Sequence, residues 1–161
     1  SGGTNAMTID STGRILLPQL PIACVTLTTS NTQDGTHPYS TTGADMLLDK
    51  ITVNRGSVYN ASNGQFTAPI TGLYRFKYTF LRDDSSAANV TYFQVYKNGV
   101  AWSEAGGASY SSAGTTNYSV TTNETLVSLN ATDYLTIRMI GGEIYIDGTG
   151  VYHSVIFELV G

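Results

Sequence analysis

The sequence has few charged residues and no concentration of positive charge. Asp, Glu, Lys and Arg together make up 12% of the 161 residues, whereas an ordinary soluble domain has about 25%. The eight Lys and Arg residues form no run, and the formal net charge is −4. These features argue against nucleic acid or an anionic membrane as a partner.

Cysteine and long apolar segments are equally scarce. Cys24 is the only cysteine, so the chain can form neither an internal disulfide nor a cysteine-based metal site. It lies in the apolar residues 22–25, where we expect a small buried side chain. No apolar run reaches the roughly 20 residues that a membrane-spanning helix needs, so we expect no membrane insertion.

No set of residues is typical of a catalytic site. The two histidines, His37 and His153, accompany no motif of a nucleophilic serine. Carboxylates that could form a glycoside-cleaving pair, such as Glu104 and Glu143, have no suggestive spacing. We therefore expect a protein that is not an enzyme.

The sequence also shows no cofactor motif. Asp83, Asp84 and Asp147 fall in expected loops, and loop carboxylates are typical ligands of calcium. No calcium-loop motif surrounds them, so a solvated acidic loop is the simpler interpretation. We expect no cofactor, with calcium as the alternative.

The most regular pattern lies in residues 58–80. Its first half contains the turn formers Asn60, Asn63 and Gly64. In its second half four aromatic residues alternate with other side chains: Tyr74, Phe76, Tyr78 and Phe80. A period of two places all four on one face of a strand, which predicts a half-buried antiparallel strand over the core of a sandwich.

Turn signals and alternating segments recur along the rest of the chain. Asn98-Gly99 predicts a type I′ hairpin between strands at residues 89–96 and 100–104. We expect further strands at residues 21–28, 46–53, 118–129, 134–140 and 151–160. Residues 105–116 predict a long loop or a weak edge strand. No window has a helical period, so the expected fold class is an all-β sandwich.

The first 20 residues read as a leader that is separate from one domain at residues 21–161. The leader is polar at its start, and Thr12, Gly13 and Arg14 predict a turn. Three apolar residues follow at 15–17, before a proline. We interpret this segment as a leader or linker to that domain; the resemblance given below implies that it comes from a preceding fibre segment.

A spaced set of mainly aromatic, Asn and Gly positions runs through the middle of the chain. Its members are Leu48, Asn54, Tyr59, Phe66, Gly72, Tyr74, Phe76 and Tyr78. This set resembles the signature of the globular-head family of complement component 1q, whose jelly roll is shared with the tumour necrosis factors. Leu48 stands where that family usually has Phe, and Thr132 where it usually has Gly. The resemblance implies a jelly-roll sandwich of about ten antiparallel strands that assembles as a homotrimer.

The leader carries a second resemblance. Its sequence MTIDSTGR is similar to short segments that precede terminal domains in bacteriophage tail-fibre proteins. Animal members of the complement family commonly have a collagen stalk, and this chain has no Gly-X-Y repeat. Together the two resemblances imply the terminal domain of a phage tail fibre or related virion protein, located in the virion or extracellular.

The implied function is adhesion without catalysis. The domain would recognise a host cell-surface receptor, either a glycan or an outer-membrane protein, as a homotrimer whose three copies bind together. Tyr, Trp and polar side chains in loops suit such recognition. The residues that we expect to contact the receptor are Asp83, Asp84, Trp102, Tyr110, Tyr145 and Asp147.

The aromatic residues outnumber the needs of one small core. The candidates for the core or for the trimer interface are Tyr78, Phe80, Tyr92, Tyr134, Tyr152 and Phe157. The sequence leaves these two roles open, because both select large apolar side chains. Two alternative functions also remain: a structural cap that trimerises a fibre, and a secreted complement-like or cytokine-like protein ligand.

Overall fold

The computed structural model describes residues 8–16, 20–28, 43–83, 90–110, 118–146 and 148–161. These residues form the following strands: β1 (Thr8–Ile9), β2 (Ile15–Leu16), β3 (Ile22–Thr26), β4 (Lys50–Arg55), β5 (Tyr59–Asn60), β6 (Gln65–Thr67), β7 (Gly72–Leu81), β8 (Val90–Lys97), β9 (Val100–Tyr110), β10 (Val120–Leu129), β11 (Tyr134–Gly141) and β12 (Ser154–Leu159). The described part contains no helix, and hence none that could cross a membrane.

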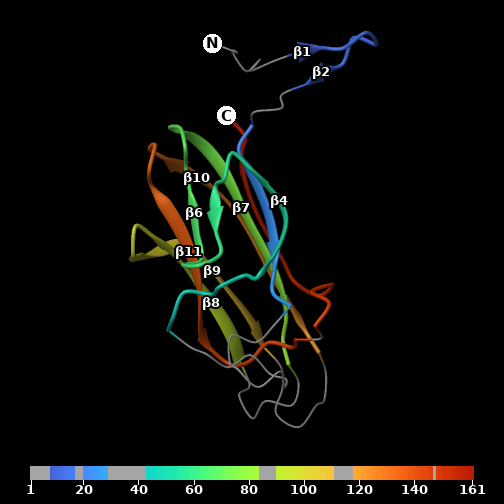
Figure 1. Ribbon diagram of the computed structural model, residues 1–161. Helices are drawn as coiled ribbons and strands as arrows, with labels where there is room; N and C mark the ends of the chain where they lie inside the picture. The colour runs from blue at the N-terminus through green and yellow to red at the C-terminus, as the bar shows by residue number, and fades with distance from the viewer. Residues whose placement is uncertain (1–7, 17–19, 29–42, 84–89, 111–117, 147) are drawn as a thin grey trace.

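Ten of these strands form a β-sandwich of two sheets (Figure 1). The first sheet has the order β10-β7-β12-β3-β4, and the second has the order β5-β6-β11-β8-β9. Strands that are neighbours in these sheets pair antiparallel, as in β7 with β10 and β12. The expectation of an all-β sandwich is therefore confirmed.

Strand β7 lies beside β12, the central strand of the first sheet, and supplies much of the core. Tyr74, Phe76, Tyr78 and Phe80 are each at most 1% exposed, which confirms the alternation predicted from the sequence. The Tyr74 ring stacks on Phe157 of β12 at 4.8 Å between centroids. Full burial of a large apolar side chain contributes about 1.5–3 kcal/mol, so this row is a major source of stability.

Three signature positions form one hydrogen-bonded unit at the end of the core. The Tyr59 hydroxyl donates to the Leu48 carbonyl at 3.0 Å and accepts from the Leu48 backbone N–H at 2.8 Å. The Asn54 side chain donates to the Tyr59 carbonyl at 2.8 Å and accepts from the Tyr59 backbone N–H at 3.0 Å. The Tyr59 ring also packs 4.5 Å from that of Phe66. The signature spacing thus brings together groups that satisfy one another's buried polar atoms.

Gly72, another signature position, is required by close packing. A Cβ atom there would lie 2.6 Å from Leu159 Cδ1 and 2.8 Å from the Gly161 carbonyl oxygen. Contacts this short do not occur without a shift of the backbone or of the leucine. Any larger residue at position 72 would therefore displace the chain terminus from β7.

The expected strand at residues 46–53 is wrong in its position. The strand β4 begins only at Lys50, and the segment before it is irregular. Met46 and Leu48 are nevertheless 1% and 0% exposed, and the Met46 backbone N–H donates to the Ile137 carbonyl at 2.9 Å. The apolar residues that suggested a strand therefore reach the core from a segment that crosses to the second sheet.

The expectation of a buried Cys24 is also wrong. Its neighbours Ala23 and Val25 are 0% and 1% exposed and point into the core. Alternation then turns Cys24 outward, where it is half-buried between Ile156 of β12 and Val53 of β4. The local apolar run did not reveal this orientation, because it contains no polar residue to mark the outer face.

The hairpin between β8 and β9 has the predicted geometry. Asn98 and Gly99 have φ angles of 51° and 78°, and two positive φ values are the mark of a type I′ turn. Thr132 has a φ of 74° in the turn before β11. This left-handed conformation explains why Gly is usual at that signature-related position, since a β-branched residue is strained there.

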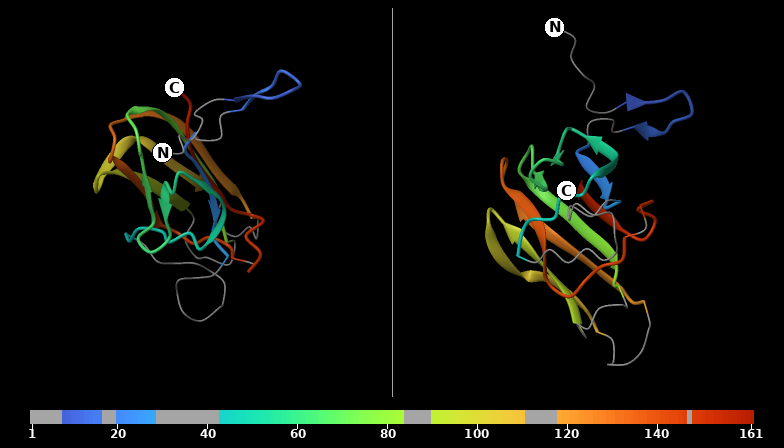
Figure 2. Two further views of the ribbon diagram at one scale, coloured as in Figure 1. Left: turned by 45° about the horizontal axis from the view of Figure 1, so that its top comes forward. Right: turned by 60° about the horizontal axis from the view of Figure 1, so that its bottom comes forward.

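The leader contains a small hairpin that stands away from the sandwich (Figures 1 and 2). Strands β1 and β2 form a sheet of their own. The Asp10 carboxylate accepts hydrogen bonds from the Thr12 hydroxyl at 2.6 Å and from Arg14 Nε at 2.6 Å. These bonds, chiefly that from Thr12, lower the Asp10 pKa to about 2. The ionised Asp10 side chain therefore closes the predicted turn.

Candidate binding surfaces

Three tyrosines meet at the end of the sandwich that lies opposite the leader. Tyr118 precedes β10, Tyr145 follows β11 and Tyr152 precedes β12. The Tyr145 ring lies 5.2 Å from that of Tyr118 and 5.8 Å from that of Tyr152, both edge-to-face. Tyr118 and Tyr152 are 53% and 45% exposed. We call these three residues the tyrosine cluster.

The end of β7 holds the backbone beside each of these tyrosines. The Arg82 backbone N–H donates to the carbonyl of Ser119, and the Tyr145 N–H donates to that of Leu81 at 2.9 Å. The Leu81 N–H in turn donates to Nδ1 of His153, whose Nε2 contacts the Tyr145 carbonyl. These hydrogen bonds attach the backbone beside the tyrosine cluster to the end of β7.

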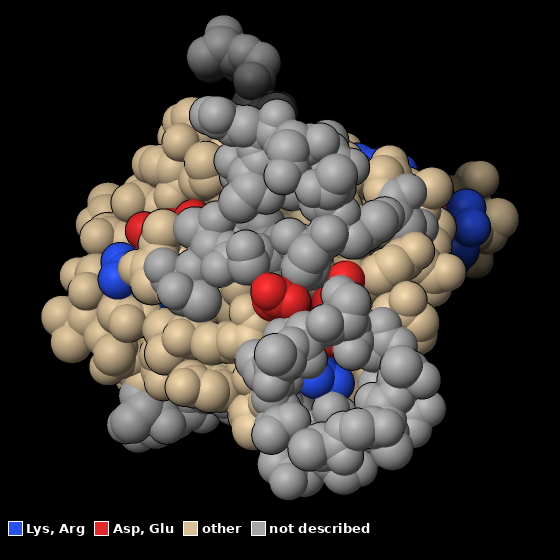
Figure 3. All heavy atoms as spheres, turned by 90° about the horizontal axis from the view of Figure 1, so that it is seen from below, with Lys and Arg blue, Asp and Glu red and all other residues tan. Residues whose placement is uncertain are grey.

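The described surface at this end carries little charge. Figure 3 shows this end from below: both acidic and basic side chains lie near its middle, among described residues that are mostly uncharged. In the described part of the chain, no three Asp, Glu, His or Cys side chains lie close enough together to hold a metal ion. Among the described residues, this end therefore offers exposed aromatic rings and few charged side chains.

The predicted receptor-contact residues fall in different environments. Asp83, two residues after β7, is only 3% exposed, and its backbone N–H donates to the Glu143 carbonyl at 3.1 Å. Tyr145 belongs to the tyrosine cluster. Trp102 lies on strand β9 and packs partly against the core.

Three further predicted contact residues cannot be placed. Asp84 and Asp147 lie outside the described residues. Tyr110 is the last residue of β9, so residues 105–110 belong to an edge strand; the structure does not describe the Tyr110 side chain. Their roles, like that of Asp83, stay predictions.

The exposed fractions assign the six candidates for the core or the trimer interface to one role or the other. Tyr78, Phe80 and Phe157 are at most 1% exposed and belong to the core. Tyr92 and Tyr152, in contrast, are 41% and 45% exposed. Tyr134 is half-buried at the start of β11. Only the last three have surface to offer to a partner.

The outer face of the first sheet is rich in exposed aliphatic side chains. We call the following residues the aliphatic face: Ile51, Val53, Leu73, Val120 and Leu126, which are 36–58% exposed. Charged side chains on the same face neutralise one another. Arg75 Nε lies 2.6 Å from Glu158, and Lys77 Nζ lies 3.6 Å from Glu124, which also approaches Arg75.

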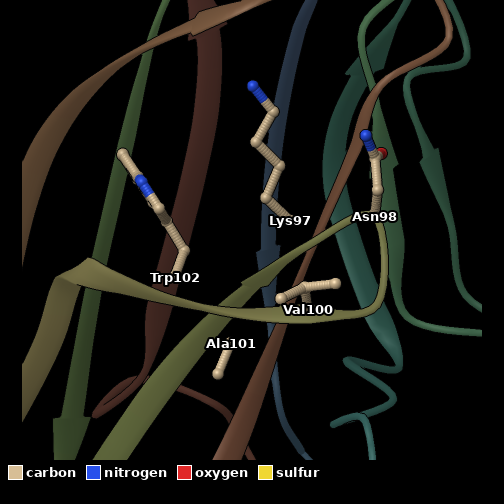
Figure 4. A pocket seen from close by; sticks show the side chains of 5 residues that line it. All are labelled: Lys97, Asn98, Val100, Ala101 and Trp102. Carbon is tan, nitrogen blue, oxygen red and sulfur yellow. The ribbon is translucent and has the colours of Figure 1, made fainter.

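A pocket of about 350 Å³ lies at the β8–β9 hairpin (Figure 4). It is lined by Lys97, Asn98, Val100, Ala101 and Trp102. Figure 4 shows the side chains of Lys97 and Trp102 extending in the same direction from the two strands of the hairpin. The pocket therefore combines an indole with polar groups, in a site separate from the tyrosine cluster.

The strand order of the two sheets defines a jelly roll, and the sequence identifies its type. Residues 29–155 match the C1q domain family, and the chain belongs to this family. Domains of this kind and of the tumour necrosis factor type are typically extracellular trimers that bind ligands or receptors. The resemblance stated from the signature residues is confirmed to that extent.

Solved structures with the same fold include proteins from zebrafish, S. frugiperda and mouse. The globular domain of zebrafish complement 1qA is 12% identical, with a TM-score of 0.64 over 88% of this chain and 98% of that one. Eiger TNF from S. frugiperda is 9% identical, with a TM-score of 0.67 over 89% and 94%. Murine APRIL at pH 5.0 is 11% identical, with a TM-score of 0.63 over 88% and 99%. At these identities the likeness establishes the fold alone.

Sequence reasoning missed Tyr118 and treated Lys97 and Asn98 only as turn residues. One signal could have found Tyr118. Consecutive antiparallel strands alternate in direction, so the start of β10, the end of β11 and the start of β12 meet at one end of the sandwich. The aromatic residues that flank those three points could therefore have been grouped.

Proposed function

We propose that this chain is a non-catalytic receptor-binding domain that works as a homotrimer. In this proposal the aliphatic face joins the protomers, and the tyrosine cluster contacts the receptor. The observation that carries it is the tyrosine cluster, which is exposed, held by hydrogen bonds to β7, and located opposite the leader. Rigid aromatic side chains provide contact area with little loss of conformational entropy.

The aliphatic face supports the trimer. Exposed aliphatic side chains spread over several strands of one sheet are typical of a surface that another chain covers. The charges on this face form compensated pairs of Arg75, Lys77, Glu124 and Glu158. Their burial between protomers would therefore leave no single unpaired charge, which would be costly.

The setting that we propose is the tip of a phage tail fibre, in the virion. Two features support it: the resemblance of the leader to segments in such fibres, and the position of the leader hairpin at the end away from the tyrosine cluster (Figure 1). A fibre that entered through the leader would present the tyrosines toward a host cell. Three copies would convert weak single contacts into firm attachment.

Light scattering tests the assembly. We expect the mass of a trimer for the unaltered chain and the mass of a monomer for Leu126→Glu. Arg75 lies opposite Leu126 in the antiparallel pairing and can accept the new carboxylate, so the protomer should stay folded. Val151→Glu places the same charge on a residue that is 73% exposed near the tyrosine cluster, and we expect this control to remain a trimer.

Binding of the labelled trimer to a panel of bacteria tests the receptor role. We expect saturable binding to a few strains that their surface polysaccharide or outer-membrane extract competes away. A trimer that binds no strain would instead favour the structural cap. Binding to a purified animal protein with no binding to bacteria would favour the secreted ligand.

A further inference from the structure

The pocket at the β8–β9 hairpin has an unusual supply of unused hydrogen-bond donors. Lys97 Nζ donates to the Ser128 carbonyl at 3.1 Å and lies 3.4 Å from Asp133 Oδ2. An ammonium group has three N–H bonds, so one remains for a ligand. The side chain of Lys97 is thus held in place without being saturated.

Asn98 is arranged in the same way. Its Nδ2 donates to Asp133 Oδ1 at 2.8 Å, and its Oδ1 accepts the Tyr134 backbone N–H at 2.9 Å. A carboxamide has two N–H bonds, so one is left. The indole N–H of Trp102 also has no hydrogen-bond partner among the residues that the structure describes. Three donors therefore remain at this pocket, together with the second lone pair of Asn98 Oδ1.

The pocket has no net charge. The ammonium of Lys97 is balanced by the carboxylate of Asp133, and the other lining residues are uncharged. The hydrogen bond from Asn98 lowers the pKa of Asp133, so this carboxylate is ionised at neutral pH. An anionic ligand would place its charge beside this carboxylate, and the like-charge repulsion disfavours it.

The walls of the pocket are mostly apolar. Val100, Ala101 and the indole of Trp102 provide them, and Trp102 is anchored because it packs partly against the core. A purely hydrocarbon ligand would strip water from the three donors without replacing it, which costs free energy for each donor. The ligand must therefore combine an apolar face with several acceptor oxygens.

We propose that this pocket binds one ring of a neutral sugar. The C–H face of a pyranose would pack on the Trp102 indole, and its hydroxyl oxygens would accept hydrogen bonds from Lys97 and Asn98. The volume of about 350 Å³ lies at the lower end of the range for small-molecule sites, about 300–1,000 Å³, which suits one or two rings. The site does not depend on the tyrosine cluster.

Tryptophan fluorescence of the trimeric protein tests the proposal directly. Trp102 is the only tryptophan in the chain, so the emission reports on this pocket alone. We expect methyl glycosides of neutral hexoses to change it saturably, with a Kd on the order of 1 mM for a single shallow site. The glucuronic acid analogue of the same ring should bind at least about tenfold more weakly, because it adds a carboxylate beside Asp133.

Two variants and a matched control locate the ligand. Lys97→Met keeps the aliphatic stem, and Asn98→Gly keeps the backbone, since glycine adopts the φ of 51° without strain. Each removes a donor, so we expect about tenfold weaker sugar binding. Lys50→Met makes the same chemical change on the first sheet, and it should leave the affinity unchanged.

A second measurement detects sugar binding without the tryptophan fluorescence. Trp102→Phe keeps an aromatic wall but removes the fluorophore, so binding is followed by saturation transfer from protein to sugar protons. We expect transfer to weaken but persist. The proposal is overturned if no neutral glycoside gives a saturable change, if the glucuronic acid analogue binds equally well, or if Lys97→Met binds as tightly as the unaltered chain. None of these results bears on cell binding by the tyrosine cluster.

Discussion

Two groups of tyrosines in this molecule differ in burial and in what their hydroxyls do. Tyr59 and Tyr78 are 4% and 1% exposed in the core, whereas Tyr118 and Tyr152 project from the end of the sandwich. The buried hydroxyl of Tyr59 has two backbone partners, and burial raises its pKa to about 12. The comparison shows that one residue type stabilises the fold where it is buried and forms exposed surface where it flanks the strands.

The two buried tyrosines differ in the hydrogen bonds that their hydroxyls make. The Tyr78 hydroxyl has no partner among the described residues, and burial raises its pKa as well. The Tyr59 hydroxyl, in contrast, satisfies both the N–H and the carbonyl of Leu48. The two side chains therefore contribute differently to stability, although both are large and buried.

The largest expected effect comes from Tyr59→Phe. This change leaves the N–H and the carbonyl of Leu48 buried without partners, and we expect the free energy of unfolding to fall by about 3 kcal/mol. Urea unfolding measures it. Tyr78→Phe is the matched control, and we expect a change within about 0.5 kcal/mol of zero. An equal fall in the free energy of unfolding in the two variants would contradict the different roles of the Tyr59 and Tyr78 hydroxyls.

Tyr152→Ala tests the exposed group. We expect binding to a responsive bacterial strain to weaken about tenfold, the effect of losing one aromatic contact. The free energy of unfolding should change by no more than about 0.5 kcal/mol, since the side chain is half exposed. A large loss of stability with unchanged binding would move Tyr152 into the structural group.

Thr132→Gly tests a backbone position that should affect stability and not binding. The left-handed φ of 74° strains a β-branched residue, and glycine relieves this strain while adding freedom to the unfolded chain. We expect a net gain of about 1 kcal/mol in the free energy of unfolding, measured with urea, and no change in cell binding. A loss of stability would show that the threonine side chain outweighs the strain.

The last expected effect appears only at alkaline pH. The Tyr59 pKa is raised from 10.0 to about 12, so the folded state resists its ionisation and the unfolded state does not. Its contribution to stability is fully present below pH 10 and is lost as the pH rises toward about 12. We expect urea midpoints to decline over this interval, and to decline less in Tyr59→Phe. An equal decline of the urea midpoint with pH in both proteins would contradict the raised pKa of Tyr59.

The sequence predicted the parts of the fold that depend on local rules. Alternation in β7 marked its buried face, because successive side chains of a strand point to opposite sides. Asn98-Gly99 predicted its turn, because these residues adopt positive φ at little cost. Local rules failed for Met46 and Cys24, where burial depends on which sheet a segment crosses to and on which way a strand faces.

By itself, then, the sequence determined the all-β class, the family resemblance, the core aromatics and the hairpin. Only the tertiary structure decided that Tyr118, Tyr145 and Tyr152 touch, that Asp83 is buried, and that the β8–β9 hairpin forms a pocket with Trp102. The physical reason is that backbone propensity and alternation act over a few residues. Contacts between residues far apart in the chain depend instead on strand order and register, which are set by the packing of the whole sandwich.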